Sequence, residues 1–127
     1  MTDVPGDRQY TKDHEWAQSK DGRVVVGITH YAQDQLGDVV FVGLPEPGAE
    51  VTAGEPLGEV ESTKSVSDVY SPVTGKVLEK NADVEQTPEL VNTDPYGGGW
   101  LVSIEPSEDA SEMLSADEYR AFIEEAS

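Results

Sequence analysis

One lysine, Lys64, stands where a covalent attachment would be chemically simple. It follows Ser62 and Thr63, precedes Ser65, and separates two stretches that have the composition of β-strands. This pattern predicts a β-hairpin with Lys64 at its tip, where small and polar neighbours leave the amine open to a modifying enzyme. Such an amine can form an amide with a group carrier such as biotin or lipoate. The turn by itself is compatible with biotin, with lipoate or with no modification.

Other kinds of chemistry find little support in the chain. It has no cysteine, and the spacing of His14 and His30 matches no metal-binding motif. There is no G-x-S-x-G motif, and the glycines at 97–99 are not followed by the Lys-Ser/Thr pair of a phosphate-binding loop. Carboxylates are so abundant that no pair of them points to acid–base catalysis. We therefore expect no catalytic residue, no metal site and no enzymatic activity in this chain.

The charge balance excludes several classes of partner. There are 8 basic and 26 acidic residues, which gives a net charge of −18 at pH 7. This charge repels nucleic acid and anionic membrane surfaces. The acids are spread over the whole chain, which favours a solvated acidic surface and a halophilic source, where salt would screen the repulsion. With no long apolar run and no leader-like N-terminus, a cytoplasmic protein is expected.

The segment before Lys64 is predicted to contain a hairpin and a short helix. Asp21-Gly22 is a two-residue turn signal between strands expected over residues 10–17 and 23–28. Thr29 can cap the N-terminus of the helix, and Gly37 is placed to end it.

The remaining segments are predicted to add strands and a last helix. Residues 38–44 are typical of a buried strand, and residues 90–99 of a loop. Ser115 and Glu118 form a capping box, which marks the start of a C-terminal helix. The pattern as a whole predicts a mainly β fold of two antiparallel sheets, in one domain over residues 1–127.

Five segments match a known family in the same order along the chain. They are residues 10–16, 26–42, 61–75, 90–101 and 114–119. In these segments the chain resembles the glycine cleavage system H protein, a lipoyl carrier of glycine catabolism and one-carbon metabolism. The resemblance implies a barrel–sandwich hybrid fold of two antiparallel sheets, with a short inserted helix and a C-terminal helical segment. It also implies lipoic acid in amide linkage to Lys64.

The resemblance further implies a non-catalytic carrier that works with several enzymes. In the family, glycine decarboxylase (the P-protein) places an aminomethyl group on the lipoyl arm. An aminomethyltransferase (the T-protein) passes the one-carbon unit to tetrahydrofolate, and dihydrolipoamide dehydrogenase (the L-protein) reoxidises the arm. These three enzymes and a lipoate-attaching enzyme are the partners expected for this chain.

A cleft that receives the loaded arm is also implied by the resemblance. The adduct carries a cationic amine, so its docking site needs carboxylates. Glu15 and Asp68 occupy the matching positions of the family pattern, and Asp13 stands where relatives often have a small hydroxyl residue. An apolar floor for the arm is expected from Ile28, Leu36 and Val66.

Several other functions remain open on the sequence. Biotin carriers usually place methionines beside the lysine, and lipoyl domains of acyltransferases usually contain Asp-Lys-Ala, so Thr63-Lys64-Ser65 fits neither. An H-like protein that relays lipoate to other carriers would use the same lysine. An acidic binding module without any modification is a further alternative.

Overall fold

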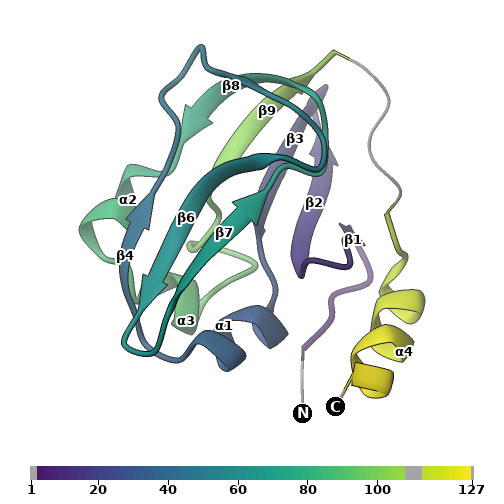
Figure 1. The fold of residues 1–127 in the computed structure, drawn as a ribbon. Helices are drawn as coiled ribbons and strands as arrows, with labels where there is room; N and C mark the ends of the chain where they lie inside the picture. Colours follow the sequence, from purple (N-terminus) through teal and green to yellow (C-terminus); the bar gives the residue numbers. More distant parts are fainter. Residues whose placement is uncertain (1–2, 108–112, 127) are drawn as a thin grey trace.

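The computed structural model describes residues 3–107 and 113–126, and its strands form two antiparallel sheets that face each other (Figure 1). The six-stranded sheet has the order β1 (Gln9–Tyr10), β2 (Glu15–Lys20), β3 (Arg23–Ile28), β9 (Val102–Pro106), β8 (Gly75–Lys80) and β5 (Glu50–Val51). The three-stranded sheet has the order β4 (Val39–Gly43), β6 (Pro56–Ser62) and β7 (Val66–Tyr70). The predicted pair of antiparallel sheets is confirmed, and no pairing among the described strands closes them into one barrel.

The core between the two sheets is rich in valine. In β3, Val24, Val26 and Ile28 are buried, as expected where alternate residues of a strand face the core. From the other sheet, Val60 and Val69 meet them in the same cluster. Branched side chains of this kind suit the pleated surface of a sheet, and their burial removes apolar area from water. This core fixes the distance between the sheet that carries Lys64 and the sheet that carries Glu15.

In the described part of the chain, four helices accompany the sheets: α1 (His30–Leu36), α2 (Ala82–Gln86), α3 (Leu90–Thr93) and α4 (Ala116–Ala126). The predicted limits of α1 are confirmed. The Thr29 hydroxyl accepts a hydrogen bond from the Ala32 N–H at 3.1 Å. Gly37 ends the helix with φ = 82°, a conformation that favours glycine, and its N–H donates to the carbonyl of Gln33.

The predicted hairpin at Asp21-Gly22 is also confirmed, between β2 and β3. Asp21 has φ = 52° and Gly22 has φ = 80°. Two positive φ values in a two-residue loop are the mark of a type I′ turn, whose twist matches that of the strands it joins. The hairpin therefore sets the register of β2 and with it the position of Glu15.

The strand predicted over residues 38–44 is present as β4, but it is not buried throughout. It lies at the edge of the three-stranded sheet, with a register shift between Val39 and Phe41. The irregularity leaves Val40 56% and Phe41 47% exposed, whereas Val39 and Val42 are buried. A run of apolar residues predicts a strand covered on both faces, and an edge strand with a bulge breaks that expectation.

The segment predicted as a loop over residues 90–99 begins with the short helix α3, and α2 was not predicted either. Both helices are a single turn or slightly more, which is too short for a 3.6-residue apolar period to emerge. Asn81 caps α2 by accepting a hydrogen bond from the Asp83 N–H at 3.1 Å. The expectation of a loop is thus wrong for Leu90–Thr93.

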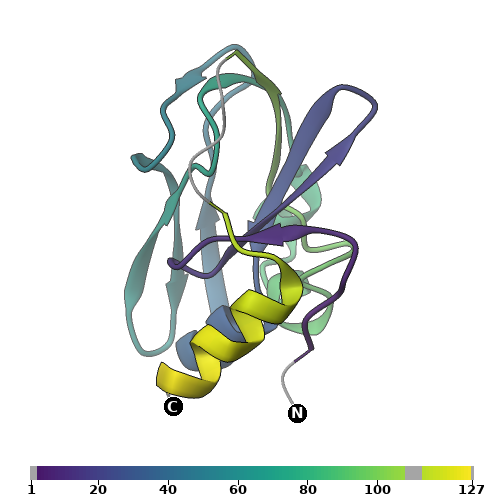
Figure 2. The same ribbon diagram turned by 90° about the vertical axis from the view of Figure 1, so that its right-hand side faces the viewer.

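The predicted capping box at the start of α4 is confirmed. The Ser115 N–H donates to the Glu118 carboxylate at 2.9 Å, and the Glu118 N–H donates to the Ser115 hydroxyl at 3.2 Å. Figure 2 shows α4 crossing beside the N-terminal strand β1. Tyr119 of α4 stacks on Tyr10 of β1, with ring centroids 4.8 Å apart. The two ends of the described chain therefore pack against each other.

Candidate functional site

Lys64 lies at the tip of the β6–β7 hairpin, as predicted, and is exposed. Figure 1 shows the two strands of this hairpin beside each other. The Ser62 N–H donates to the Ser65 carbonyl at 2.8 Å. The Ser62 hydroxyl accepts from the backbone N–H of Lys64 at 3.2 Å and of Ser65 at 3.1 Å. A short polar side chain that binds the backbone ahead of it is a common way to stabilise a tight turn. Ser62 thus holds the turn that presents the lysine.

The corner between α1 and β4 supports the hairpin tip. The Thr63 N–H donates to the carbonyl of Asp38 at 3.1 Å. The stem of Lys64 lies over Gly37, since a Cβ added to Gly37 would be 3.3 Å from Cε of Lys64. Glycine therefore serves two purposes at position 37: it adopts a positive φ and leaves room for the lysine stem.

A cavity of about 280 Å³ brings the predicted carboxylates together. Asp13, Glu15 and Asp68 all line it, although Asp68 is more than 50 residues away along the chain. Ile28 and Leu36 line the same cavity, as predicted for an apolar floor. Cavities with apolar walls and a few polar groups are typical of ligand sites.

Val66 is not one of the residues that line this cavity, so its predicted place in the apolar floor is wrong. Its side chain is 58% exposed on the other face of the sheet. The neighbouring residues Val60, Ser67 and Val69 line the cavity instead, together with Tyr31 of α1. A shift of one position along a strand moves a side chain to the opposite face, and sequence alone did not settle that register.

Glu15 is the most buried carboxylate of the site, with 2% of its surface exposed. Its Oε1 accepts from the Thr11 hydroxyl at 2.6 Å, and its Oε2 accepts from the Tyr70 N–H at 3.2 Å. Burial raises the pKa of Glu15 to about 7, and these two hydrogen bonds act in the opposite direction. A cationic group in the cavity would favour the ionised form, because opposite charges attract strongly where water is excluded.

His14 is held by its neighbours rather than free to bind a metal. Its Nδ1 lies 2.8 Å from the Tyr119 hydroxyl, which is also 2.8 Å from the Thr29 hydroxyl. Its ring stacks on Tyr31 at 4.7 Å, and burial lowers the pKa of His14. Within residues 3–107 and 113–126, no group of three potential ligands is close enough to bind a metal ion.

Tyr119 supports residues of the site, although it was not predicted from the sequence to do so. It joins helix α4 to His14, which lines the cavity, and to Thr29, the cap of α1. The capping box at Ser115 predicted the helix but assigned no contact to Tyr119. No local signal in the sequence pairs Tyr119 with a histidine 105 positions earlier, so only the folded chain reveals this contact.

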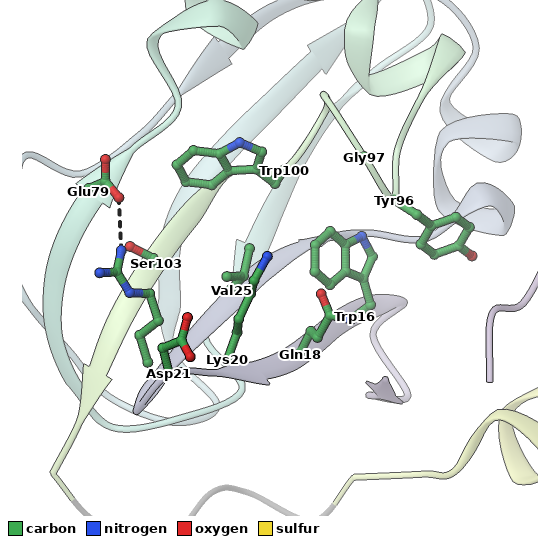
Figure 3. Close-up of a pocket in the computed structure, with 11 residues that line it drawn as sticks. Trp16, Gln18, Lys20, Asp21, Val25, Glu79, Tyr96, Gly97, Trp100 and Ser103 are labelled. Atoms are coloured by element: carbon green, nitrogen blue, oxygen red, sulfur yellow. Dashed lines mark hydrogen bonds and ion pairs between the residues drawn. The ribbon is translucent and has the colours of Figure 1, made fainter. Parts of the chain in front are cut away.

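A second cavity, of about 430 Å³, lies on the outer face of the six-stranded sheet (Figure 3). It is bounded by Trp16, Tyr96 and Trp100, with the ion pair of Arg23 and Glu79 at one side. None of the predicted site residues lines it. Trp16 is 1% exposed and donates from its indole N–H to the Pro95 carbonyl at 3.0 Å, which indicates a structural role.

Comparison with known proteins gives one consistent result. The family model described as "Glycine cleavage H-protein" matches residues 8–126. A glycine cleavage system H protein of Mycolicibacterium vanbaalenii is 55% identical over 129 residues, which cover 97% of this chain and 98% of that protein. One of Mycobacterium tuberculosis, strain H37Rv, is 59% identical over 118 residues, which cover 91% of this chain and 88% of that protein.

A solved structure agrees with these matches. The crystal structure of a glycine cleavage system H protein from Mycobacterium marinum superposes with a TM-score of 0.89 at 50% identity, covering 93% of this chain and 97% of that one. The sequence matches and the structural match therefore identify the same class of protein, a carrier of the H-protein type. The chain belongs to the glycine cleavage H-protein family. In the described part of the chain, no helix has the length and apolar character needed to cross a membrane.

Proposed function

We propose that this chain is the lipoyl carrier of the glycine cleavage system, with lipoic acid joined to Lys64. The observation that carries the proposal is an exposed lysine at a hairpin tip, in a chain of the H-protein family, beside a cavity with a buried carboxylate. When attached, the lipoyl group supplies a disulfide that takes up the aminomethyl group of glycine. The chain's own residues present, receive and shield this arm.

The surroundings of Lys64 suit an amide-linked arm. The flanking residues Thr63 and Ser65 are small, and the lysine stem passes over Gly37, where no side chain obstructs it. Formation of the amide would remove the positive charge of Lys64, so the net charge would fall by one from −18. The arm could then turn either outward to an enzyme or back toward the cavity.

The cavity suits the cationic amine of the loaded arm. We assign Glu15 and Asp68 as its counter-charges, with Asp13 as a third carboxylate at the rim. Ile28 and Leu36 would cover the apolar part of the arm and exclude water from the adduct. Because the pKa of Glu15 is about 7, the free energy needed to ionise this buried carboxyl group is small at neutral pH. The ionised form can then pair with the cationic amine.

The proposal includes the partners and setting expected of such a carrier. Residues 1–127 would act as one non-catalytic carrier domain. It would be loaded by glycine decarboxylase, unloaded by the aminomethyltransferase, reoxidised by dihydrolipoamide dehydrogenase, and modified in the cytoplasm by a lipoate-attaching enzyme. An H-like protein that only relays lipoate would carry the same group and would fail to support glycine–bicarbonate exchange.

The test combines intact mass with activity. Protein from its native source should carry one lipoyl group, and Lys64→Arg should carry none. With glycine decarboxylase, lipoylated wild type should support glycine–bicarbonate exchange, whereas Lys64→Arg should not. Lys76→Arg is the matched control, because Lys76 is also exposed and follows a turn. A lipoyl group or full exchange activity in Lys64→Arg would overturn the proposal.

A further inference from the structure

The exposed apolar side chains of this protein are concentrated on one sheet. Among the described residues, four large hydrophobic side chains are exposed: Val40, Phe41, Val66 and Leu78. Three of these, all but Leu78, belong to the three-stranded sheet that carries Lys64. Single exposed apolar residues need no explanation, but a group of them on one element often marks an interaction site.

Strand pairing arranges two of these side chains in a row with an acid. Phe41 of β4 lies opposite Glu61 of β6, and Glu61 lies opposite Val66 of β7. Directly opposed residues of antiparallel strands share a face, and the next residues, Val42 and Val60, are buried in the core. Phe41, Glu61 and Val66 therefore point to solvent together.

The ring of Phe41 has a defined position on this face. A Cβ added to Gly43 would lie 3.2 Å from Cε2 of Phe41 and 3.5 Å from Cγ of Glu59. The ring thus lies along the strand over Gly43, with Glu59 beside it. An ordered aromatic ring loses little conformational freedom when a partner covers it, which suits it to act as an anchor.

The row is close to the lysine that would carry the arm. Val66 follows Lys64 by two positions, and Glu61 precedes it by three, so at about 3.3 Å per residue the row begins within roughly 10 Å of the hairpin tip. Any enzyme that acts on the end of the arm must come close to this tip. The partner's surface would then meet an aromatic and aliphatic row bordered by Glu59 and Glu61.

We propose that Phe41, with Val40 and Val66, is the docking surface for the enzyme that loads the Lys64 arm, glycine decarboxylase. Its chemistry fits a partner surface with an apolar socket for Phe41, bordered by Lys or Arg that face Glu59 and Glu61. The apolar contact would supply most of the affinity, and the charges would speed association and fix orientation. The inference rests on the proposed carrier function.

The test uses fully lipoylated proteins, checked by intact mass, in glycine–bicarbonate exchange with glycine decarboxylase. Phe41→Ser should raise the KM for the carrier by about tenfold or more, with kcat within about twofold, because an anchor is lost while the arm is intact. Phe41→Leu should recover most of the affinity. Leu78→Ser, which removes an exposed side chain of β8 on the other sheet, should leave KM unchanged.

The acidic border has its own matched test. Glu59→Gln with Glu61→Gln should lower kcat/KM at low salt and flatten its dependence on salt, since screened charges no longer steer the encounter. Glu50→Gln with Glu105→Gln makes the same change in net charge on the six-stranded sheet and should have little effect. Thermal unfolding of each variant shows whether it is folded.

The possible outcomes separate this inference from the proposed function. If lipoylated wild type fails to support exchange, the carrier function is wrong and the docking surface fails with it. If wild type is active and folded Phe41→Ser has the KM of wild type, the carrier function stands and the docking surface is wrong. An equal rise in KM for Phe41→Ser and Leu78→Ser would also overturn the inference.

Discussion

At the scale of single residues, Glu15 is a buried carboxylate whose two oxygen atoms each accept a hydrogen bond. It lies at the start of β2, but its two hydrogen bonds come from Thr11 ahead of the strand and from Tyr70 on the other sheet. One carboxylate thus links the two sheets at the cavity. The pKa of Glu15 therefore depends on contacts that exist only in the folded protein.

We predict that Glu15 titrates near neutral pH. Its pKa rises from an ordinary value of 4.5 to about 7 because burial disfavours the charge. Between these values the folded state holds a proton that the unfolded state has released, so stability falls as pH rises from 4.5 to 7 and is then level. The loss is on the order of 3 kcal/mol, since one pKa unit is about 1.4 kcal/mol.

NMR titration of the carboxyl carbons and chemical denaturation between pH 4 and pH 8 would check this. Glu15→Gln should remove the titration and flatten the fall in stability, while Asp68→Asn should leave the resonance of Glu15 in place. A Glu15 carboxyl that titrates near pH 4.5 would contradict the prediction.

A second prediction concerns Thr11, whose hydroxyl binds Oε1 of Glu15 at 2.6 Å. This hydrogen bond stabilises the charged carboxylate, so Thr11→Val should raise the pKa of Glu15 further. Thr11→Ser keeps a hydroxyl and should leave the pKa close to that of wild type. The same NMR titration measures the shift, and a lowered pKa in Thr11→Val would show that the hydroxyl acts differently.

At the scale of elements, the C-terminal helix α4 contacts the cavity through His14, one of the residues that line it. Tyr119 is fully buried, and its hydroxyl contacts both His14 and Thr29. His14 has φ = 70°, a conformation that disfavours side chains larger than glycine. The contact with Tyr119 is thus one of the interactions that hold the backbone beside Glu15 in this strained form.

We predict that Tyr119→Phe lowers the free energy of unfolding by about 1–3 kcal/mol, because it leaves buried polar partners without their hydrogen bonds. The NMR signals of the His14 ring should shift as well. Tyr31→Phe is the control, since it removes a hydroxyl but keeps the ring that stacks on His14. Equal stability of Tyr119→Phe and wild type in urea denaturation would contradict the role given to this hydroxyl.

The elements that were predicted correctly from the sequence are those whose structure is determined by residues close together in the chain. The turn at Asp21-Gly22, the caps at Thr29 and Gly37, and the capping box at Ser115 depend on residues within a few positions of each other. The errors have causes outside the segment. Sheet order decides that β4 is an edge strand, so the exposure of Phe41 could not be read from its apolar neighbours.

The residues of the candidate site also differ in how far local sequence could identify them. Lys64 was visible from its turn alone, whereas Glu15, Asp13 and Asp68 were separable from the other acids only through the family resemblance. The cavity brings these carboxylates together as expected, but the wrong assignment of Val66 shows that the side of a strand was not fixed by the pattern. The contact of His14 with Tyr119 depends on tertiary packing between the two ends of the chain.

At the scale of the whole molecule, the net charge of −18 on 127 residues sets the response to salt. Mutual repulsion destabilises the compact state, and salt at molar concentration reduces the screening length to about 3 Å. We predict a melting temperature that rises clearly between low and molar KCl. An uncharged osmolyte at matched osmolality controls for general exclusion effects, and a melting temperature that does not change with KCl would argue against a halophilic adaptation.

The packing of the chain ends also has a consequence for biosynthesis. Tyr10 pairs with Leu114 through two backbone hydrogen bonds, and Tyr119 reaches His14. The three strands that present Lys64 end at Tyr70, so a nascent chain holds a complete lysine hairpin well before the ribosome adds the residues that brace the cavity. If Lys64 carries the arm as proposed, a chain that stops after residue 107 should still gain one lipoyl group on incubation with the lipoate-attaching enzyme, as measured by intact mass. Under the proposed function, attachment to Lys64 can therefore precede the synthesis of α4, the helix that completes the packing around His14.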